Sequence, residues 1–281
     1  MVYGDRDSSL TGKRVYRHSI AARVSHWLWT LAMLVLLMSG LQIFNAAPYL
    51  DASDKTNPAR RVLAIDAHQL GGANGPVVGV THIFGRSFTT TGLLGYTDDG
   101  AGTRMERAFP GWATLPGEQD LADGRLWHLA FGWLLTLSIV VYLIAGAIRK
   151  DLRELILRPS DVPKLLPMQL YYLRLRKEPP PHGTYNPLQK AAYTGVLFGF
   201  IPLIILTGLA LSPGIDAIAG PITEVFGGRQ FARLWHFALM SLLVLYFLTH
   251  MVLVFGTGAL NNLRSMITGW YTLKEHDGVG P

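Results

Sequence analysis

Residues 234–263 contain no Asp, Glu, Lys or Arg, and within this apolar stretch His236 and His250 lie fourteen residues apart. An α-helix has about 3.6 residues and rises about 5.4 Å per turn, so fourteen residues make almost four full turns. Both imidazoles therefore lie on one side of the helix, about 21 Å apart along its axis. Because ionisable side chains are costly inside a membrane, this spacing indicates ligand binding at two depths.

Charge-free stretches long enough to cross a bilayer about 30 Å thick occur four times, at residues 24–50, 126–148, 191–215 and 234–263. Hydrophobic residues make up 49% of the 281 residues and charged residues 16%, as is typical of membrane proteins. The sequence predicts one all-α integral membrane domain over residues 1–281, a bundle of four transmembrane helices at about 25–45, 125–149, 188–211 and 234–257. The first apolar stretch exceeds the core of about 7 to 15 residues of a cleaved signal peptide, so we expect a retained helix.

The distribution of charge predicts the orientation. Residues 1–25 hold five Lys or Arg against two acids, residues 149–190 hold nine against four, and residues 46–124 hold six against nine. Lys and Arg concentrate on the cytoplasmic side of membrane proteins. We therefore expect a bacterial inner-membrane protein with both termini and the loop 149–187 in the cytoplasm and the insert 46–124 outside. This basic charge faces the membrane surface and does not indicate a nucleic-acid partner.

The insert 46–124 is too long to be a simple connection between two helices. Its glycine-rich part, residues 71–95, predicts irregular or β-hairpin structure. We expect a small external subdomain or a docking surface. On the cytoplasmic side, residues 161–175 predict a short amphipathic helix, and a Pro run at 179–181 follows it.

Topology sorts the membrane histidines into two pairs. His26 near the start of the first helix and His250 far along the fourth lie at similar depth on the cytoplasmic side, while His128 and His236 open their helices on the external side. Two pairs of histidine at two depths suit two non-covalent haems b with two axial His each, so we expect all four to bind haem iron. The chain has no Cys, which excludes iron–sulfur clusters, thiolate ligands and covalently attached haem.

Further residues are expected near the haems. Gly40 lies fourteen residues after His26, on the same helix face but at the external level, where it gives clearance for a porphyrin or serves ordinary helix packing. Arg229 and Arg233 outside, and Arg23 inside, are candidates for contact with haem propionates; each is equally well explained as an interfacial charge. The other histidines are expected at the surface: His68 and His82 in the insert, as solvated or structural residues, and His18, His182 and His276 in cytoplasmic segments.

Several segments resemble a known family. RVSHWLWTLAMLVLLMSG, LWHLAFGWLL and LWHFALMSLLVLYFLTH resemble the di-haem cytochrome b membrane subunits of formate dehydrogenases and nickel–iron hydrogenases, and SPGIDAI, FGGRQFARLWHF and NNLRSMITGWY are similar to thiosulfate-reductase-type subunits. The resemblance implies two haems b held by histidines of helices one, two and four, which gives the same two pairs. It also implies quinone chemistry near the cytoplasmic haem, with Asn186, Gln189 and Lys190 as candidate contacts. Asn186 before Pro187 is equally typical of a helix N-cap.

The leading hypothesis is an electron-transfer subunit that links the quinone pool to a periplasmic oxidoreductase and has no catalytic side chains of its own. The resemblance to thiosulfate-reductase-type subunits implies that this partner is a molybdopterin enzyme. The long insert departs from the formate dehydrogenase subunits, so their partner contacts do not carry over. The alternative is a stand-alone membrane haem oxidoreductase that acts on a small acceptor such as superoxide or a ferric chelate. A histidine-lined metal transporter is disfavoured because the four apolar stretches contain no Asp or Glu.

Overall fold

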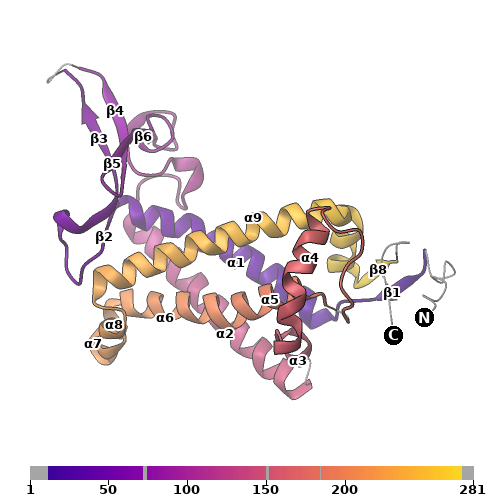
Figure 1. Ribbon diagram of the computed structural model, residues 1–281. Helices are drawn as coiled ribbons and strands as arrows, with labels where there is room; N and C mark the ends of the chain where they lie inside the picture. The colour runs from indigo at the N-terminus through magenta and orange to yellow at the C-terminus, as the bar shows by residue number, and fades with distance from the viewer. Residues whose placement is uncertain (1–11, 72–74, 150–151, 184, 274–281) are drawn as a thin grey trace. The chain divides into compact units, whose positions relative to one another are not determined.

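The computed structural model describes residues 12–71, 75–149, 152–183 and 185–273 (Figure 1). Four helices in the described chain are long and apolar enough to cross a membrane: α1 (Ile20–Asn45), α2 (Leu121–Arg149), a third span Pro187–Leu211, and α9 (Arg229–Thr268). The expectation of a mainly helical chain with four membrane spans is confirmed. The chain forms two compact units, described separately below: unit 1 comprises Met1–Trp27, Ile139–Ile201 and Leu243–Pro281, and unit 2 comprises Leu28–Ser138 and Pro202–Leu242.

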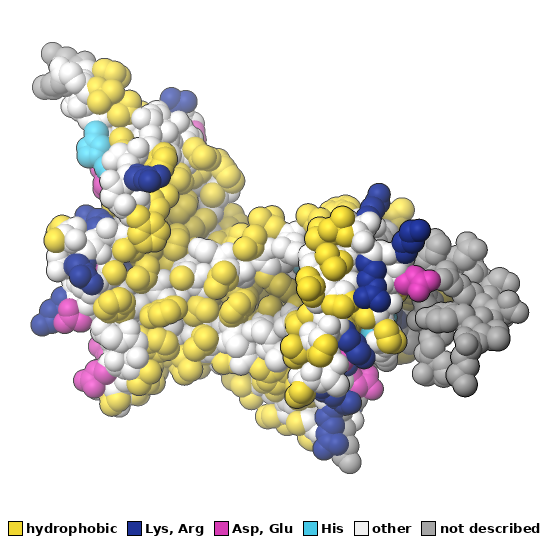
Figure 2. Space-filling view, in the orientation of Figure 1, with side chains coloured by type: hydrophobic (Ala, Val, Ile, Leu, Met, Phe, Trp, Pro, Cys, Tyr) yellow, Lys and Arg dark blue, Asp and Glu magenta, His cyan; other side chains and the backbone are white. Residues whose placement is uncertain are grey.

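The long helices expose apolar side chains along their lengths. Leu34 of α1, Val141 of α2 and Leu253 of α9 are all exposed, and hydrophobic side chains are spread over the helical surface in Figure 2. Soluble proteins rarely expose apolar patches of this extent, whereas lipid tails are a suitable environment for them. The helical surface therefore fits a multi-pass membrane protein.

Two helices depart from regular α geometry. The third span consists of α5 (Pro187–Gly195), a π-helical turn η5 (Val196–Phe200) and α6 (Ile201–Leu211); Pro202, which lacks an N–H, follows the π turn and cannot bond the carbonyl one turn earlier. In α9, Gly258 has φ 113° and ψ 80°, which breaks the helix into two segments. Glycine tolerates this positive φ because it has no Cβ.

The insert folds as β-structure within unit 2. An antiparallel sheet has the order β2 (Tyr49–Asp51), β3 (Arg61–Gln69), β4 (Val77–Ile83) and β5 (Arg86–Thr89), and β6 (Gly95–Asp98) pairs with β7 (Arg104–Arg107). Its apolar core joins it to the ends of two helices: Phe44 of α1, Leu50, Ile65 and Ala108 are buried together, with Leu234 and Phe237 of α9 packed against them. The insert is thus a packed subdomain with more strand content than a single hairpin.

Arg107 is the main polar anchor of the insert. Its side chain is 2% exposed and donates hydrogen bonds to the carbonyls of Asp99 and Gly117, to the Thr114 hydroxyl, and to the Gln42 side chain of α1 at 3.0, 2.9, 3.0 and 3.3 Å. Burial of a guanidinium is costly unless hydrogen bonds compensate it, and here both Nη atoms have partners whereas the buried Nε has none. The network holds β7 and the segment after it against the end of α1.

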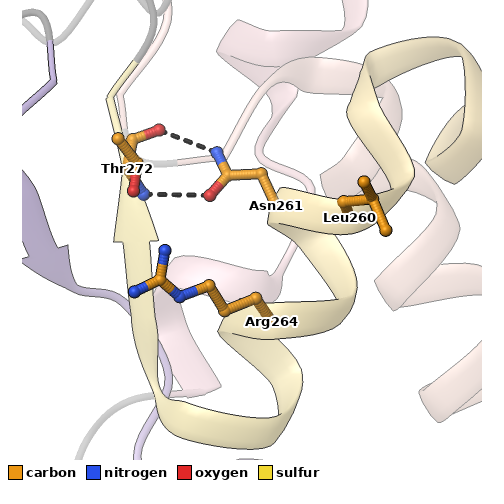
Figure 3. Close-up of a pocket in the computed structure, with 4 residues that line it drawn as sticks. All are labelled: Leu260, Asn261, Arg264 and Thr272. Carbon is orange, nitrogen blue, oxygen red and sulfur yellow. Dashed lines mark hydrogen bonds between the residues drawn. The ribbon is translucent and has the colours of Figure 1, made fainter.

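Unit 1 contains the two ends of the described chain. β1 (Arg14–Tyr16) pairs antiparallel with β8 (Trp270–Thr272) (Figure 1). Asn261, near the end of α9, fixes β8 with two hydrogen bonds: its Nδ2 donates to the Thr272 carbonyl at 2.7 Å, and its Oδ1 accepts from the Thr272 N–H at 3.1 Å. Figure 3 shows both bonds beside a shallow pocket that Leu260 and Arg264 also line.

The loop between α2 and α5 differs from its expected form. Instead of one amphipathic helix over residues 161–175, it contains α3 (Leu152–Leu155), a 3-10 helix η4 (Pro159–Lys164) and α4 (Leu165–Tyr172). Pro163 lies inside η4 and disfavours the α conformation for Val162 before it, at the start of the expected helix. The α-helical part is therefore shorter, and Asp161 lies before it.

Two helices, α7 (Pro213–Ala219) and α8 (Pro221–Val225), connect α6 to α9 in unit 2. Each begins with a proline, which is well tolerated at the first position of a helix because that N–H has no intrahelical partner. Gly227 and Gly228 then turn the chain with φ of 81° and 99°. The turn leads directly into α9, whose first two turns carry Arg229, Arg233 and His236.

Candidate haem-binding sites

His128 of α2 and His236 of α9 face each other within unit 2. Their ring centroids are 6.2 Å apart, and the ring planes are inclined by 66°. A metal bonds an imidazole nitrogen at about 2 Å, so two rings that share one metal have their centroids about 6 Å apart once the radius of each ring is added. The separation therefore matches two imidazoles that share one metal atom, and this is the pairing that the sequence predicted.

Hydrogen bonds to His128 assign its tautomer. Nδ1 lies 3.1 Å from the carbonyl oxygen of Leu36 and 3.1 Å from Oγ of Ser39. The carbonyl only accepts, and the Ser39 hydroxyl donates its proton to the carbonyl of Val35 at 2.6 Å. The His128 ring must therefore donate from Nδ1, which leaves the Nε2 lone pair for a metal.

His236 has the same arrangement. Oγ1 of Thr207 lies 2.9 Å from its Nδ1, and this hydroxyl lies 3.0 Å from the carbonyls of Leu203 and Ile204, one turn earlier in α6. Because the single hydroxyl proton goes to a carbonyl, the ring N–H is on Nδ1 and Nε2 again keeps a lone pair. Thr207 and Ser39 were not predicted as site residues.

Two glycines lie against these rings. A Cβ on Gly40 of α1 would lie 3.2 Å from Cε1 of His128, and one on Gly208 of α6 would lie 3.4 Å from Cε1 of His236. Both glycines follow directly after the hydroxyl residue that bonds the same ring. Gly40 was expected at this level of the helix; Gly208 was not predicted, although the dipeptide Thr207-Gly208 resembles Ser39-Gly40 and was the available signal.

The second pair lies in unit 1. The ring centroids of His26 in α1 and His250 in α9 are 6.4 Å apart, with an inclination of 55°. Aromatic rings flank them: Tyr246 stacks on His250 with centroids 6.2 Å apart, and the Trp27 ring meets His26 edge to face at 5.2 Å. All four histidines of the two pairs are partly exposed, as groups that bind a large planar ligand need to be. The donor set of each pair fits the two axial positions of haem iron.

A comparison with protein families bears on these pairs. The family model described as "Prokaryotic cytochrome b561" matches residues 17–269, which include all four paired histidines. The chain belongs to the prokaryotic cytochrome b561 family. It is therefore a haem-binding, membrane-embedded cytochrome b of the electron-transfer type, in agreement with the resemblance found in its sequence.

Two curated proteins are similar to this cytochrome. It is 26% identical over 251 residues to "Putative protein-methionine-sulfoxide reductase subunit YedZ1" of Azospira oryzae, and the match covers 86% of this chain and 92% of that protein. It is also 34% identical over 89 residues to "Putative cytochrome YdhU" of Escherichia coli, which covers 31% of this chain and 32% of that protein. The first match spans nearly the whole of both chains.

The arginines predicted to contact propionates have backbone partners in this cytochrome. Arg229 donates to the Leu211 carbonyl at 3.0 Å, Arg233 donates to the Ala47 carbonyl, and Arg23 donates to the Ile267 carbonyl. A guanidinium has five N–H donors, so one such bond leaves others available. Contact with a propionate stays a prediction for all three.

The candidate quinone contacts lie at the start of α5. Asn186 caps the helix: its side chain accepts from the Gln189 N–H at 2.9 Å, and Gln189 Oε1 accepts from the Asn186 N–H at 3.1 Å. Lys190 lies 3.0 Å from the carboxylate of Asp161, which holds the pKa of that carboxyl below its usual range. These contacts explain the three residues structurally, and a role in quinone binding stays a prediction.

The remaining histidines of the cytochrome differ from one another. His18, expected at the surface, is partly buried, and burial together with nearby Arg17 lowers its pKa to about 4. His182 is exposed as expected, and His276 lies outside the described residues. His68 and His82, expected as solvated or structural residues of the insert, lie next to each other there, with ring centroids 5.8 Å apart.

Proposed function

We propose that this cytochrome carries electrons between a membrane quinone and an oxidoreductase on the external side, through two haems b, each held by one histidine pair. His128 and His236 would hold the external haem, and His26 and His250 the cytoplasmic one. The observation that carries the proposal is that each histidine of α9 faces a histidine of another helix. His236 and His250 both belong to α9, fourteen residues apart in sequence.

Haem b supplies one-electron redox chemistry at each pair when it is bound. At each pair the protein would set the orientation and the electron donation of the imidazoles that hold the haem. At the external pair, Ser39 and Thr207 accept the Nδ1–H of the two rings, which fixes the tautomer and makes each Nε2 a stronger donor. Gly40 and Gly208 leave the ring edges uncovered, so that a flat macrocycle has space beside each imidazole.

The insert is the proposed docking surface for the external enzyme. Its β4–β5 hairpin presents Phe84 and Phe88, which are 80% and 50% exposed, and aromatic side chains are enriched where proteins bind one another. The similar protein from Azospira oryzae carries the name of a reductase subunit, which supports a reductase as the partner. Following the thiosulfate-reductase resemblance, we propose a molybdopterin-dependent enzyme.

The opposite end would exchange electrons with a quinone. The proposed contact region is the start of α5, where Asn186, Gln189 and Lys190 lie beside the buried Asp161. The basic cytoplasmic segments would place this end in the cytoplasm of a bacterial cell, with the insert outside the inner membrane. The pairing of β1 with β8, which brings both ends of the described chain together, supports two termini on one side.

The haem-to-protein ratio of the purified chain tests the proposal. We expect two haems b per chain by pyridine haemochrome assay. His128→Ala and His236→Ala should each remove one haem, and His26→Ala and His250→Ala the other, whereas His182→Ala should remove none. A single haem in the wild type, or loss of both haems from every variant despite a folded protein, contradicts the assignment.

Reduction by a quinol tests which histidine pair exchanges electrons with the quinone and which with the external enzyme. Variants of the external pair should still be reduced by a short-chain quinol at the remaining haem but should not pass electrons to a co-purified enzyme. Variants of the cytoplasmic pair should not be reduced by the quinol.

Capture of the external enzyme tests the docking surface. The double variant Phe84→Ser with Phe88→Ser should weaken this capture without loss of haem. The matched control is Leu173→Ser, at an exposed residue of unit 1. Turnover of a small acceptor by the isolated subunit, with no partner bound, would contradict the subunit role.

A further inference from the structure

Three side chains with metal-binding atoms meet on the β3–β4 hairpin of the insert. Asp66 and His68 are on β3 and His82 is on β4, and one ligand atom of each lies within 4.8 Å of the other two. Histidine side chains at the surface of this hairpin are visible in cyan in Figure 2. No other group of three or more such residues is found in the described part of the chain.

The strand register explains the cluster. Asp66 pairs with Val80 and His82 pairs with Ala64, and because alternate residues of a strand share a face, Asp66, His68 and His82 lie on the same face. The other face carries Ile65 and Thr81, each 3% exposed. The cluster is therefore on the face of the sheet opposite Ile65, which packs in the apolar core of the insert.

The distances fit ligands of a metal better than hydrogen bonds. Nε2 of His68 lies 3.5 Å from Nε2 of His82, longer than the N–H bonds of about 2.7–3.2 Å usual in proteins. Two nitrogens bound to a tetrahedral zinc ion at about 2.0–2.1 Å are about 3.3 Å apart. The Asp66 carboxylate lies 4.0 Å from the same Nε2 of His82, and a change of its side-chain torsions closes the remaining gap.

Ser87 orients His82 for this role. Its Oγ lies 2.8 Å from Nδ1 of His82, and Ser87 is directly opposite His82 in the β4–β5 pairing. Histidine ligands of metals usually donate the N–H of their other nitrogen to such a group. With the proton on Nδ1, the Nε2 lone pair faces both His68 and the Asp66 carboxylate, and a cation between them removes the repulsion of these electron-rich atoms.

We propose that Asp66, His68 and His82 bind a divalent transition-metal ion of the zinc type. Two imidazoles and a carboxylate are ligands that zinc accepts, whereas calcium and magnesium require oxygen ligands. Three protein ligands leave a fourth position, and the side chains of His82 and Asp66 are 35% and 41% exposed, so water reaches that position. The site is separate from both haem-ligating pairs and does not depend on the proposed function.

Zinc binding to the full-length haem-loaded protein in nanodiscs tests the site. After removal of loose metal with a chelator, equilibrium dialysis against Zn²⁺ with elemental analysis gives zinc per chain. We expect one zinc per wild-type chain, and a Kd weaker by more than about tenfold in His68→Ala and His82→Ala. Ser87→Ala should weaken the Kd by about tenfold, because Ser87 holds the ring of His82 but does not bind the metal. His182→Ala, which removes an exposed histidine elsewhere, should bind zinc as the wild type does.

The haem spectrum of each variant serves as the folding control. If an alanine variant loses haem, Asp66→Asn takes the place of that variant in the comparison. Asp66→Asn keeps the shape of the side chain and removes its charge, so it should also weaken zinc binding. Equal zinc binding by the wild type and by the folded His68→Ala, His82→Ala or Asp66→Asn protein overturns the proposal. Failure of zinc binding leaves the haem count unaffected, so the two proposals are tested independently.

Discussion

The hydroxyl oxygen of Thr207 lies 2.9 Å from Nδ1 of His236. Ser39 makes the same contact with His128 at 3.1 Å, and a glycine follows each hydroxyl residue and lies against the same ring. The two imidazoles of one pair are thus supported by matching dipeptides from two helices, α1 and α6. The support fixes which nitrogen is free to bind iron and keeps the space beside it open.

Thr207→Val should weaken the external haem site. Valine keeps the shape of threonine but cannot accept the His236 N–H, and loss of a hydrogen-bond partner of a ligating imidazole lowers metal affinity about 10–100-fold. The imidazole also becomes a weaker donor, so the midpoint potential of this haem should rise in a redox titration. The other haem should keep its potential, and Thr207→Ser, which retains the hydroxyl, should restore the wild-type value. Equal shifts of both haems would contradict a local role.

Gly40→Ala should reduce occupancy of the same haem. The added Cβ would lie 3.2 Å from Cε1 of His128, closer than an ordinary van der Waals contact, so the ring must move. A larger side chain in Gly40→Leu should remove the haem entirely, as measured by the haem-to-protein ratio. Gly256→Ala is the matched control, since its Cβ would meet nothing within 4 Å; there the substitution should leave haem content unchanged and favour the helix slightly. Equal haem content in Gly40→Leu and wild type would show that no porphyrin lies there.

The sequence was sufficient to predict the helices and the histidine pairs, because both follow from patterns with a fixed geometry. A charge-free stretch has to cross the membrane as a helix, and the spacing between His236 and His250 determines their common face. The partners Ser39 and Thr207 were not predictable in the same way. They depend on how far each helix is rotated about its axis, which side-chain packing determines and which no short sequence pattern records.

The insert shows a second limit. His68 and His82 are fourteen residues apart in sequence, as are His236 and His250, yet here they meet because a hairpin folds between them. Their meeting depends on the register of β3 against β4, which glycine-rich sequence specifies poorly. For the same reason the insert was expected as irregular or hairpin structure and not as a four-stranded sheet. His18 was expected at the surface because its segment is polar, but it is partly buried, and its backbone N–H bonds the carbonyl of Gly269, far away in sequence.

Arg107→Met should loosen the insert without removing haem. The variant removes a buried guanidinium that donates to four acceptors, and a buried acceptor left without a partner costs about 1–3 kcal/mol. We expect faster cleavage between residues 46 and 124 in limited proteolysis, with an unchanged haem spectrum. Arg104→Met on the same strand is the control, because Arg104 is exposed and its loss should not alter the cleavage rate. Unchanged cleavage of Arg107→Met would mean that the apolar core alone holds the insert.

Asp161→Asn should make the protein less stable at neutral pH and less sensitive to acid. Lys190 lies 3.0 Å from the buried carboxylate and lowers its pKa, with help from the Arg158 N–H. A lowered pKa in the folded state stabilises the protein at pH values above the usual Asp pKa of about 4, and this contribution is lost as the pH falls through the folded value. The wild type should therefore lose thermal stability below about pH 4, whereas the variant should start at a lower stability and show less change over that range. Parallel melting curves for the two proteins from pH 7 to pH 3 would contradict an ionised pair at this position.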